Sequence, residues 1–363
     1  MENNFLDLKE KWRIRLLEKQ VNQKLYKYSD ILSREINNPR SFYKIKKGNV
    51  SELHLLGFGK LKTFPKVILK FPKLRHLFIS NSKITEIPTN IEKLSDLVVF
   101  ETIRNPLKKF PKQFGYLKNL KKLIITGAYI NEYPSQFGDL YRLEILDISD
   151  SKPFINRIPE FIFSLQNLKH LRLRNNNIVN IPEDITKLKK LEGLIILHTQ
   201  LKEMSESIKD LASLKYLDLY KNQINRLPEN LGNLRNLRSL RASQNKLSFI
   251  PKSIGDLKQI EYIDLSYNQI LKIPKSIEQL NTVRHINLMG NKLTSFPNLS
   301  RIPKNLEVLN LLENPLKELP SILRKFQPES KLRQLMVNPN LAESIDKEAR
   351  KKYILTYLPG TLF

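Results

Sequence analysis

The sequence predicts an α/β solenoid, in which stacked coils place short parallel strands on a concave side and a helical cap closes each end. A set of nine apolar, asparagine and proline positions recurs every 23 residues through most of the chain. Within each copy, apolar residues alternate with polar ones over a short stretch, which is typical of a strand with one buried face. One copy buries too few apolar side chains to offset the entropy lost on ordering it. The copies must therefore stack.

The stretch Leu237–Gln259 shows the repeat most clearly. Its recurring positions are Leu237, Leu240, Ala242, Asn245, Leu247, Ile250, Pro251, Ile254 and Leu257. The following copy repeats the order as Ile260, Ile263, Leu265, Asn268, Ile270, Ile273, Pro274, Ile277 and Leu280. With the first apolar residue as position 1, repeats 1 to 13 begin at Val50, Leu74, Leu97, Leu120, Leu143, Leu168, Leu191, Leu214, Leu237, Ile260, Val283, Leu306 and Leu332.

Three positions of the repeat have a definite structural role. Positions 4 and 6 are apolar between polar neighbours and predict the strand. Position 9 is asparagine in many repeats, and its amide can bond to the backbone of adjacent coils at a sharp bend. Position 15 is proline in most repeats, where a fixed φ starts the return across the convex side. The asparagines are Asn105, Asn176, Asn222, Asn245, Asn268, Asn291 and Asn314.

The pattern LxxLxLxxNxIxxIPxxIxxLxx resembles a leucine-rich repeat over about residues 50–340. The proline-bearing, 23-residue form is similar to repeats of intracellular signalling scaffolds and of many bacterial proteins. The resemblance implies a right-handed horseshoe whose concave parallel sheet binds a protein. We therefore divide the chain into an N-terminal helical cap (1–49), a solenoid of about 13 repeats (50–340) and a C-terminal helical cap (341–363).

Both ends of the chain predict helices. Residues 1–38 have apolar side chains mostly three or four apart, which predicts an amphipathic helix, broken near Ser29 and ended before Pro39. We interpret it as a cover for the first repeat, since the ends of solenoids need one; a membrane-surface or partner-binding helix is the alternative. Asn340–Leu358 predicts a basic helix that ends at Pro359–Gly360 and resembles the caps of bacterial leucine-rich repeat proteins.

The amino half departs from the pattern more often than the carboxyl half. Ser82, Ala128, Ser151 and Thr199 replace asparagine at position 9, and repeat 5 carries two extra residues in DSKPFINRIP. We expect this half to be the less regular one, either shaped toward a partner or altered by drift.

Composition limits the function. The net charge is +26, there is no cysteine, and no apolar run is long enough for a membrane span. The amino terminus lacks the apolar block of a secretory signal, so we expect a cytoplasmic monomer and leave non-classical secretion open. Acids and bases nearly balance on the concave positions, which places the basic excess on the convex turns and residues 1–49. That excess leaves nucleic acid or anionic membrane open as alternative partners.

Charged residues at position 2 alternate in sign along the repeats, except at the consecutive Lys215 and Arg238, and predict ion pairs between neighbouring strands of opposite charge. They are Lys121, Glu144, Lys169, Glu192, Lys215, Arg238, Glu261, Arg284, Glu307 and Arg333. Asp218, Arg241 and Asp264 at position 5 predict the same. His54 and His76 lie on adjacent strands without an evident third ligand, so we expect no metal site. No motif of a catalytic or cofactor site is present, and we expect neither.

Two surfaces of the predicted sheet are candidates for binding a partner. The tyrosine patch combines exposed aromatic and basic side chains, as protein interfaces do; it consists of Tyr216, Tyr220, Tyr262, Tyr267, Arg172, Arg174, His198 and Lys221. The apolar patch consists of Phe78, Val99, Ile103, Ile124 and Ile145. We expect its members to be exposed and contiguous, which usually marks a binding surface. Aromatic residues that a broad sheet merely tolerates are the alternative interpretation.

These features predict a non-enzymatic scaffold that binds a protein through its concave sheet. The composition, rich in asparagine and lysine, suggests a bacterial source, hence a role directed at a host. The alternative is an electrostatic binder that uses the basic convex surface.

Overall fold

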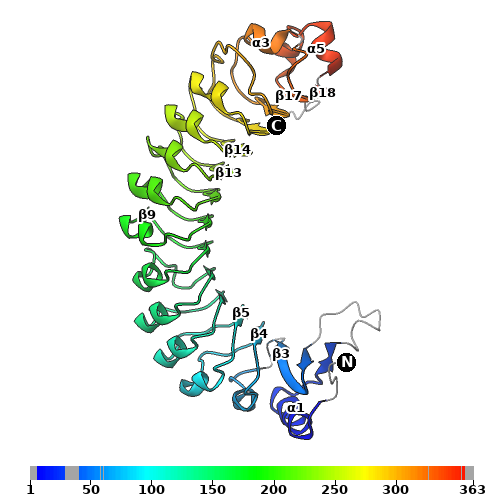
Figure 1. Ribbon diagram of the computed structural model, residues 1–363, viewed down its shortest axis with the longest axis vertical. Helices are drawn as coiled ribbons and strands as arrows, with labels where there is room; N and C mark the ends of the chain where they lie inside the picture. Colours follow the sequence, from blue (N-terminus) through cyan, green and yellow to red (C-terminus); the bar gives the residue numbers. More distant parts are fainter. Residues whose placement is uncertain are drawn as a thin grey trace. The chain divides into compact units, whose positions relative to one another are not determined.

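The computed structural model describes residues 6–28, 41–57, 59, 61–325, 327–352 and 354–355. The chain divides into two compact units, an N-terminal unit (Met1–Asn176) and a C-terminal unit (Asn177–Phe363). Within each unit the repeats stack, with strands along the inner side and short 3₁₀ turns along the outer side (Figure 1). This is the predicted α/β solenoid.

The described residues of the N-terminal unit include the helix α1 (Leu8–Val21) and a sheet. Its strands are β1 (Tyr26–Lys27), β2 (Phe42–Lys46), β3 (Asn49–Leu56), β4 (His76–Ser80), β5 (Val99–Ile103), β6 (Lys122–Thr126), β7 (Ile145–Ser149) and β8 (His170–Arg172). From β3 to β8 all neighbours pair in parallel, whereas β2 and β3 pair antiparallel. The outer turns are η1 (Lys66–Lys70), η2 (Thr89–Lys93), η3 (Lys112–Tyr116), η4 (Ser135–Asp139) and η5 (Glu160–Ser164).

The C-terminal unit repeats this arrangement. Its main sheet contains β10 (Gly193–Ile195), β12 (Tyr216–Asp218), β13 (Ser239–Arg241), β14 (Tyr262–Asp264), β15 (His285–Asn287), β16 (Val308–Asn310), β17 (Gln334–Met336) and β18 (Ile354–Leu355), all parallel. A small second sheet pairs β9 (Asn180–Ile181) with β11 (Glu203–Met204). The outer turns are η6 (Glu183–Lys187), η7 (Glu206–Asp210), η8 (Leu231–Asn233), η9 (Lys252–Asp256) and η10 (Lys275–Gln279).

The predicted roles of asparagine and proline are confirmed. The Asn245 amide is buried; its oxygen accepts from the Ile224 amide at 3.0 Å, and its nitrogen donates to the Leu219 carbonyl in the preceding coil at 2.9 Å. Pro251 has φ −62° and directly precedes η9. Asparagine thus joins successive coils at the bend, and proline begins the outer turn.

A left-handed residue follows the strand in nearly every repeat, always at position 8. Sequence reasoning did not anticipate it. These residues are Asn81, Arg104, Gly127, Asp150, Asn175, His198, Lys221, Gln244, Tyr267, Gly290 and Glu313, with φ between 49° and 70°. The left-handed conformation turns the chain sharply out of the strand toward the buried asparagine at position 9. Glycine, asparagine and aspartate tolerate this conformation well, and bulky side chains do so poorly.

The N-terminal cap differs from the predicted helix over residues 1–38. Helix α1 spans only Leu8–Val21 and ends at Asn22, whose left-handed backbone (φ 51°) stops it. Buried Glu10 accepts a hydrogen bond from the Val50 amide at 3.0 Å, which joins the helix to the start of β3. Strands β1 and β2 complete the cap beside α1 (Figure 1). The predicted break at Ser29 and the predicted stop before Pro39 fall outside the described residues.

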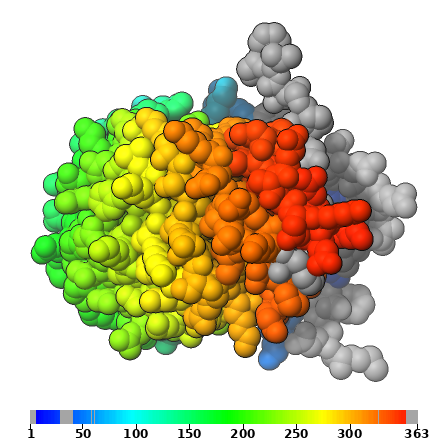
Figure 2. Space-filling view, turned by 90° about the horizontal axis from the view of Figure 1, so that it is seen from above, coloured from blue at the N-terminus to red at the C-terminus, as the bar shows by residue number. Residues whose placement is uncertain are grey.

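The C-terminal cap differs from the single helix predicted over Asn340–Leu358. It contains two short helices, α4 (Pro339–Ala342) and α5 (Lys347–Lys352), and then β18, which pairs with β17. Another short helix, α3 (Ser321–Arg324), lies near them (Figure 1). In Figure 2 the red residues of α5 lie at the end of this unit beside the orange repeats. A strand satisfies the backbone groups of the last sheet edge, which a helix cannot do.

Leucine and isoleucine at the repeat positions form the core of both units, and almost all are fully buried. In the N-terminal unit, phenylalanines continue the core under the outer turns: Phe114 lies 4.9 Å from Phe110 and 5.2 Å from Phe137, between ring centroids. Among the described residues, no helix has the length and apolarity that a membrane span needs.

Candidate functional site

In the C-terminal unit, Tyr216 and Tyr262 occupy equivalent places on β12 and β14, with Ser239 of β13 between them. Two steps of about 4.8 Å separate them across the sheet. The side chain of Tyr216 is 46% exposed, whereas Tyr262 is half-buried, and burial beside Asp264 raises the pKa of its phenol. The strands therefore present aromatic side chains two coils apart on one face.

The charges beside these tyrosines are largely satisfied within the sheet. Arg241 donates to the Asp218 carboxylate at 3.1 Å, as the sequence predicts. Burial raises the pKa of Asp218 and Arg241 opposes that rise. Asp264 is buried and accepts from the amide and hydroxyl of Ser266 at 3.1 and 2.6 Å. The position-5 charges stabilise the sheet and leave the aromatic rings as its distinctive surface.

Three further members of the tyrosine patch lie at the bend after the strands of this unit. Tyr220 is half-buried and contacts the His198 ring edge-on, with centroids 5.2 Å apart. His198 and Lys221 are exposed and left-handed, with φ of 52° and 56°. Arg172 and Arg174 are exposed in the N-terminal unit.

Tyr267 is the most unusual member of the patch. Its backbone is left-handed (φ 52°) and its side chain is 45% exposed. Its ring lies over Gly290, the position-8 residue of the next repeat: a Cβ atom at Gly290 would fall 2.6 Å from a ring carbon. The hydroxyl lies 3.7 Å from the Met289 sulfur. Glycine at 290 thus makes room for this ring.

The apolar patch of the N-terminal unit is neither exposed nor contiguous as predicted. All five of its residues are half-buried. Across the strands, Glu101 lies between Phe78 and Ile124, and Lys122 lies between Val99 and Ile145. Glu101 and Lys122 form an ion pair at 2.5 Å. The predicted exposure and contiguity were wrong because Glu101 and Lys122 stand at the same repeat positions, 5 and 3, and so lie between the apolar residues.

Two members of that patch line a hollow at the end of the strands. It has a volume of about 820 Å³ and is lined by Ile103, Ile124 and Arg174 together with Arg104, Asp147, Asp150, Tyr129 and Lys152 among others. Burial raises the pKa of Asp147, and Arg172 and Arg174 counteract part of that rise. The hollow therefore combines an apolar floor with a rim of both charges.

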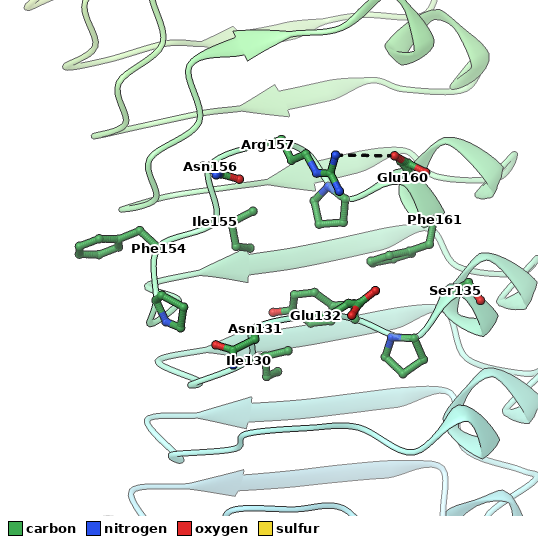
Figure 3. Close-up of a pocket in the computed structure, with 14 residues that line it drawn as sticks. Ile130, Asn131, Glu132, Ser135, Phe154, Ile155, Asn156, Arg157, Glu160 and Phe161 are labelled. Carbon is green, nitrogen blue, oxygen red and sulfur yellow. Dashed lines mark ion pairs between the residues drawn. The ribbon is translucent and has the colours of Figure 1, made fainter.

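The two-residue insertion in repeat 5 forms a second hollow, of about 670 Å³. Figure 3 shows Phe154 pointing away from Phe161, and the Arg157–Glu160 ion pair, 4.0 Å between nitrogen and oxygen, along one side. Phe154 is 50% exposed. The sequence revealed the insertion but not the hollow.

The predicted position-2 ladder is confirmed within each unit. Glu144 lies 2.9 Å from Lys121 and 2.8 Å from Lys169, and these ammonium groups lower the pKa of its carboxyl to about 2. In the C-terminal unit Lys215 pairs with Glu192 at 2.8 Å. Such exposed pairs fix register more than they add stability.

His54 and His76 do have a third potential ligand nearby. The Glu52 carboxylate lies 3.7 Å from His54 Nε2 and 3.9 Å from His76 Nδ1. Burial and then His76 lower the pKa of His54 to about 4; His76 and then Lys122 lower the pKa of Glu101 to about 2. Sequence reasoning missed Glu52, although it lies two residues before His54 and so on the same face of β3.

Comparisons with known proteins agree with the fold. The family model "leucine-rich repeat region" matches residues 159–245, and "leucine rich repeat" matches residues 243–293. A curated relative, the protein flightless-1 homolog of Caenorhabditis elegans, is 32% identical over 108 residues, which are 29% of this chain and only 8% of that protein.

Solved structures extend the likeness to the whole chain. A leucine-rich repeat protein of Leptospira interrogans matches 98% of this chain and 100% of its own, with 22% identity and a TM-score of 0.54. An internalin of Listeria monocytogenes matches 75% of this chain and 81% of its own, with 19% identity and a TM-score of 0.59. The ectodomain of the Arabidopsis thaliana receptor kinase GASSHO1/SCHENGEN3, solved with Casparian strip integrity factor 2, matches 82% of this chain and 41% of its own, with 22% identity and a TM-score of 0.63.

The repeats, the solenoid and these matches identify the chain as a leucine-rich repeat protein. Leucine-rich repeat domains generally mediate protein–protein interaction and are typically not enzymes.

Proposed function

We propose that this chain is a non-enzymatic, cytoplasmic scaffold that binds a protein partner through the strand surface of its repeats, with the tyrosine patch of the C-terminal unit as the main contact. Leucine-rich repeat solenoids generally bind proteins, and the GASSHO1/SCHENGEN3 ectodomain was solved with a bound factor. A bacterial source and a host-directed role, which the composition suggests, form part of the same proposal.

Tyr267 carries the proposal. A bulky residue in the left-handed conformation costs roughly 1 kcal/mol or more, and strained residues of this kind concentrate at functional sites. Glycine, asparagine or aspartate occupies the same position in five other repeats, and arginine, histidine, lysine, glutamine or glutamate in five more, so the fold requires a left-handed residue there but not an aromatic one. Tyr267 is also 45% exposed to solvent. A strained, exposed aromatic side chain is better explained by partner contact than by folding.

The surroundings of Tyr267 support the same function. Tyr216 is exposed to the same degree, and Tyr262 and Tyr220 add half-buried rings. Asp218 already pairs with Arg241, so a partner need not neutralise that carboxylate. Tyrosine is enriched in the residues that dominate binding energy because it buries a large area at little entropic cost.

The N-terminal unit offers a secondary contact in this proposal. Its hollow of about 820 Å³ contains Ile103, Ile124 and Arg174, three of the residues singled out from the sequence. Arg172, exposed on β8, adds a second guanidinium to the same unit. The half-buried Phe78 and Val99 lie in neighbouring strands and limit what a partner can bury there.

A display selection with a matched control tests the proposal. Peptides and small protein domains are selected against the full chain, and binders are then titrated against Tyr216→Ala/Tyr267→Ala and against Tyr116→Ala/Tyr141→Ala. Tyr116 and Tyr141 are 48% and 51% exposed, at or beside outer turns, so the control removes equal aromatic area elsewhere. We expect Tyr216→Ala/Tyr267→Ala to bind roughly 10- to 100-fold or more weakly than the wild type, as is usual when interface tyrosines are removed. The control should bind like the wild type.

The outcome also decides between this function and electrostatic binding. Nucleic acid or anionic vesicles held by the net charge of +26 would dissociate steeply with salt and would ignore both pairs of tyrosines. Binders that survive high salt but tolerate Tyr216→Ala/Tyr267→Ala would contradict the tyrosine patch as the contact surface.

A further inference from the structure

A cluster of histidine and carboxylate groups lies on the strand surface near the start of the N-terminal unit. Glu52 and His54 are on β3 and His76 is on β4, where Glu52 and His76 are direct partners in the parallel register. One donor atom from each of the three residues can be chosen so that all lie within 4.8 Å of one another. All three side chains are part-buried, with 18% to 29% of each exposed.

The spacing of these atoms is close to that of a metal site. Glu52 Oε2 is 3.7 Å from His54 Nε2 and 3.9 Å from His76 Nδ1. Ligands about 2.0 Å from a tetrahedral zinc ion lie roughly 3.3 Å apart, so a shift of about half an ångström per ligand would suffice. Among the described residues, the buried Nε2 atom of His54 has no hydrogen-bond partner. A buried polar atom without a partner requires an explanation, and a bound ion is one of the usual ones.

The groups around the cluster hold its imidazoles in place. The Phe42 ring stacks on the His54 ring, with centroids 4.1 Å apart and planes 13° apart. If His76 binds through Nδ1, its Nε2 faces the Glu101 carboxylate at 3.5 Å. Metal-binding histidines commonly direct their other nitrogen to a carboxylate in this way, which fixes the ring orientation. Lys122, 2.5 Å from Glu101, holds that carboxylate in turn.

We propose that Glu52, His54 and His76 bind a divalent transition-metal ion of the zinc class, and that Glu101 acts as a positioning residue for His76. Two imidazoles and one carboxylate suit zinc and its neighbours better than magnesium or calcium, which prefer oxygen ligands alone. Three protein ligands leave a fourth position, and the partial exposure of the cluster directs it to the strand surface.

Lys44 opposes metal binding and offers a specific test. Its ammonium lies 2.8 Å from Glu52 Oε2 and would have to release that oxygen. The ring of Tyr28, 4.5 Å from the same nitrogen, gives it an alternative contact. Removing the lysine charge should therefore strengthen metal binding, an effect that adventitious binding to surface histidines would not show.

The experiment uses the untagged full chain, freed of metal with a chelator, at pH 7.5. Zinc is titrated by calorimetry in competition with a chromophoric chelator, and cobalt is added separately to follow its visible d–d absorption. We expect one equivalent of zinc and a tetrahedral cobalt spectrum. His54→Gln and His76→Gln should abolish both signals. Glu101→Gln should keep the stoichiometry and weaken binding about 10- to 100-fold, with Glu101→Asp partly restoring it. Lys44→Gln should tighten binding.

His285→Gln is the matched control. His285 is half-buried and is the first residue of β15, as His76 is of β4, but it is not part of this cluster. Circular dichroism of each apo variant separates loss of a ligand from loss of the fold. Less than one equivalent in the wild type, or equal affinity in the wild type and a His54→Gln/His76→Gln variant that remains folded, would overturn the proposal. Unchanged affinity for zinc in Lys44→Gln would contradict the proposed position of the ion at Glu52.

Discussion

Replacing Asn245 by alanine tests how the coils are joined. The asparagine is buried; its oxygen accepts from the Ile224 amide at 3.0 Å, and its nitrogen donates to the carbonyls of Leu219 and Ala242 at 2.9 and 3.1 Å. Alanine leaves the buried Ile224 amide without a partner, at about 1–3 kcal/mol, while the Leu219 and Ala242 carbonyls keep hydrogen bonds from Asn222 and Asn268 at 2.9 Å. We therefore expect the free energy of unfolding to fall by about 1–3 kcal/mol.

Asn236→Ala is the matched control. Asn236 makes a similar inter-coil hydrogen bond, to the Ala212 carbonyl at 2.8 Å, but it is exposed and water can replace the lost contact. Its loss should cost about 0.5–1 kcal/mol. Urea unfolding followed by circular dichroism compares the two variants with the wild type, and hydrogen exchange at the Ile224 amide locates the effect. Asn245→Asp keeps the acceptor but removes the donors and should be similarly destabilised.

An Asn245→Ala variant no less stable than Asn236→Ala would refute the reasoning. It would mean that water enters the bend and satisfies the backbone, so that the buried asparagine is not what joins the coils. Unchanged exchange at Ile224 in a destabilised variant would also contradict it, because the loss would then arise elsewhere.

Three further predictions concern single side chains. The pKa of Glu144 is lowered to about 2 from 4.5, so its stabilising contribution is complete above pH 4.5 and is lost as the pH falls toward 2. Between pH 6 and pH 3 the melting temperature of Glu144→Gln should therefore fall less than that of the wild type. An equal fall would contradict this prediction. Tyr267→Asn should stabilise the protein by about 0.5–1 kcal/mol in urea unfolding, because asparagine relieves the left-handed strain, and it should weaken partner binding. Destabilisation would instead show that the ring contributes to folding. Gly255→Ala should destabilise the protein by about 1–3 kcal/mol because its Cβ would lie 2.4 Å from the Ser276 carbonyl oxygen. Gly138→Ala, where the nearest contact of the added Cβ is 3.1 Å, should lower the melting temperature less. The reverse order would be inconsistent with close packing of the outer turns.

Much of the solenoid could be predicted because the same sequence pattern recurs in every repeat. Leu240 and Ala242 at alternating positions predict a strand, Asn245 a buried bend and Pro251 the start of an outer turn, and the structure confirms each. Repetition turns weak local preferences into a strong signal. The ends were less predictable because they occur once: the sequence alone did not show that α1 ends at Asn22 or that Ile354 belongs to a strand.

The candidate surfaces depended on relations that one repeat does not contain. Phe78 and Ile124 stand at position 5 of repeats 2 and 4, with Glu101 at position 5 of the repeat between them, but only the structure showed that all of these side chains are half-buried. Tyr267 was visible as an aromatic residue, whereas its left-handed backbone and its contact with Gly290 were not.

The sequence by itself determined the repeat, the strand, the bend and the outer turn, because hydrophobic period, asparagine and proline act within one coil and its neighbours. Only the tertiary structure decided that Glu52 meets His54 and His76, that Asn245 bonds to Ile224, and that Tyr267 packs against Gly290. The physical reason is that such meetings depend on the register and turn of each coil against the next. Differences of an ångström there bring two groups into contact or keep them apart.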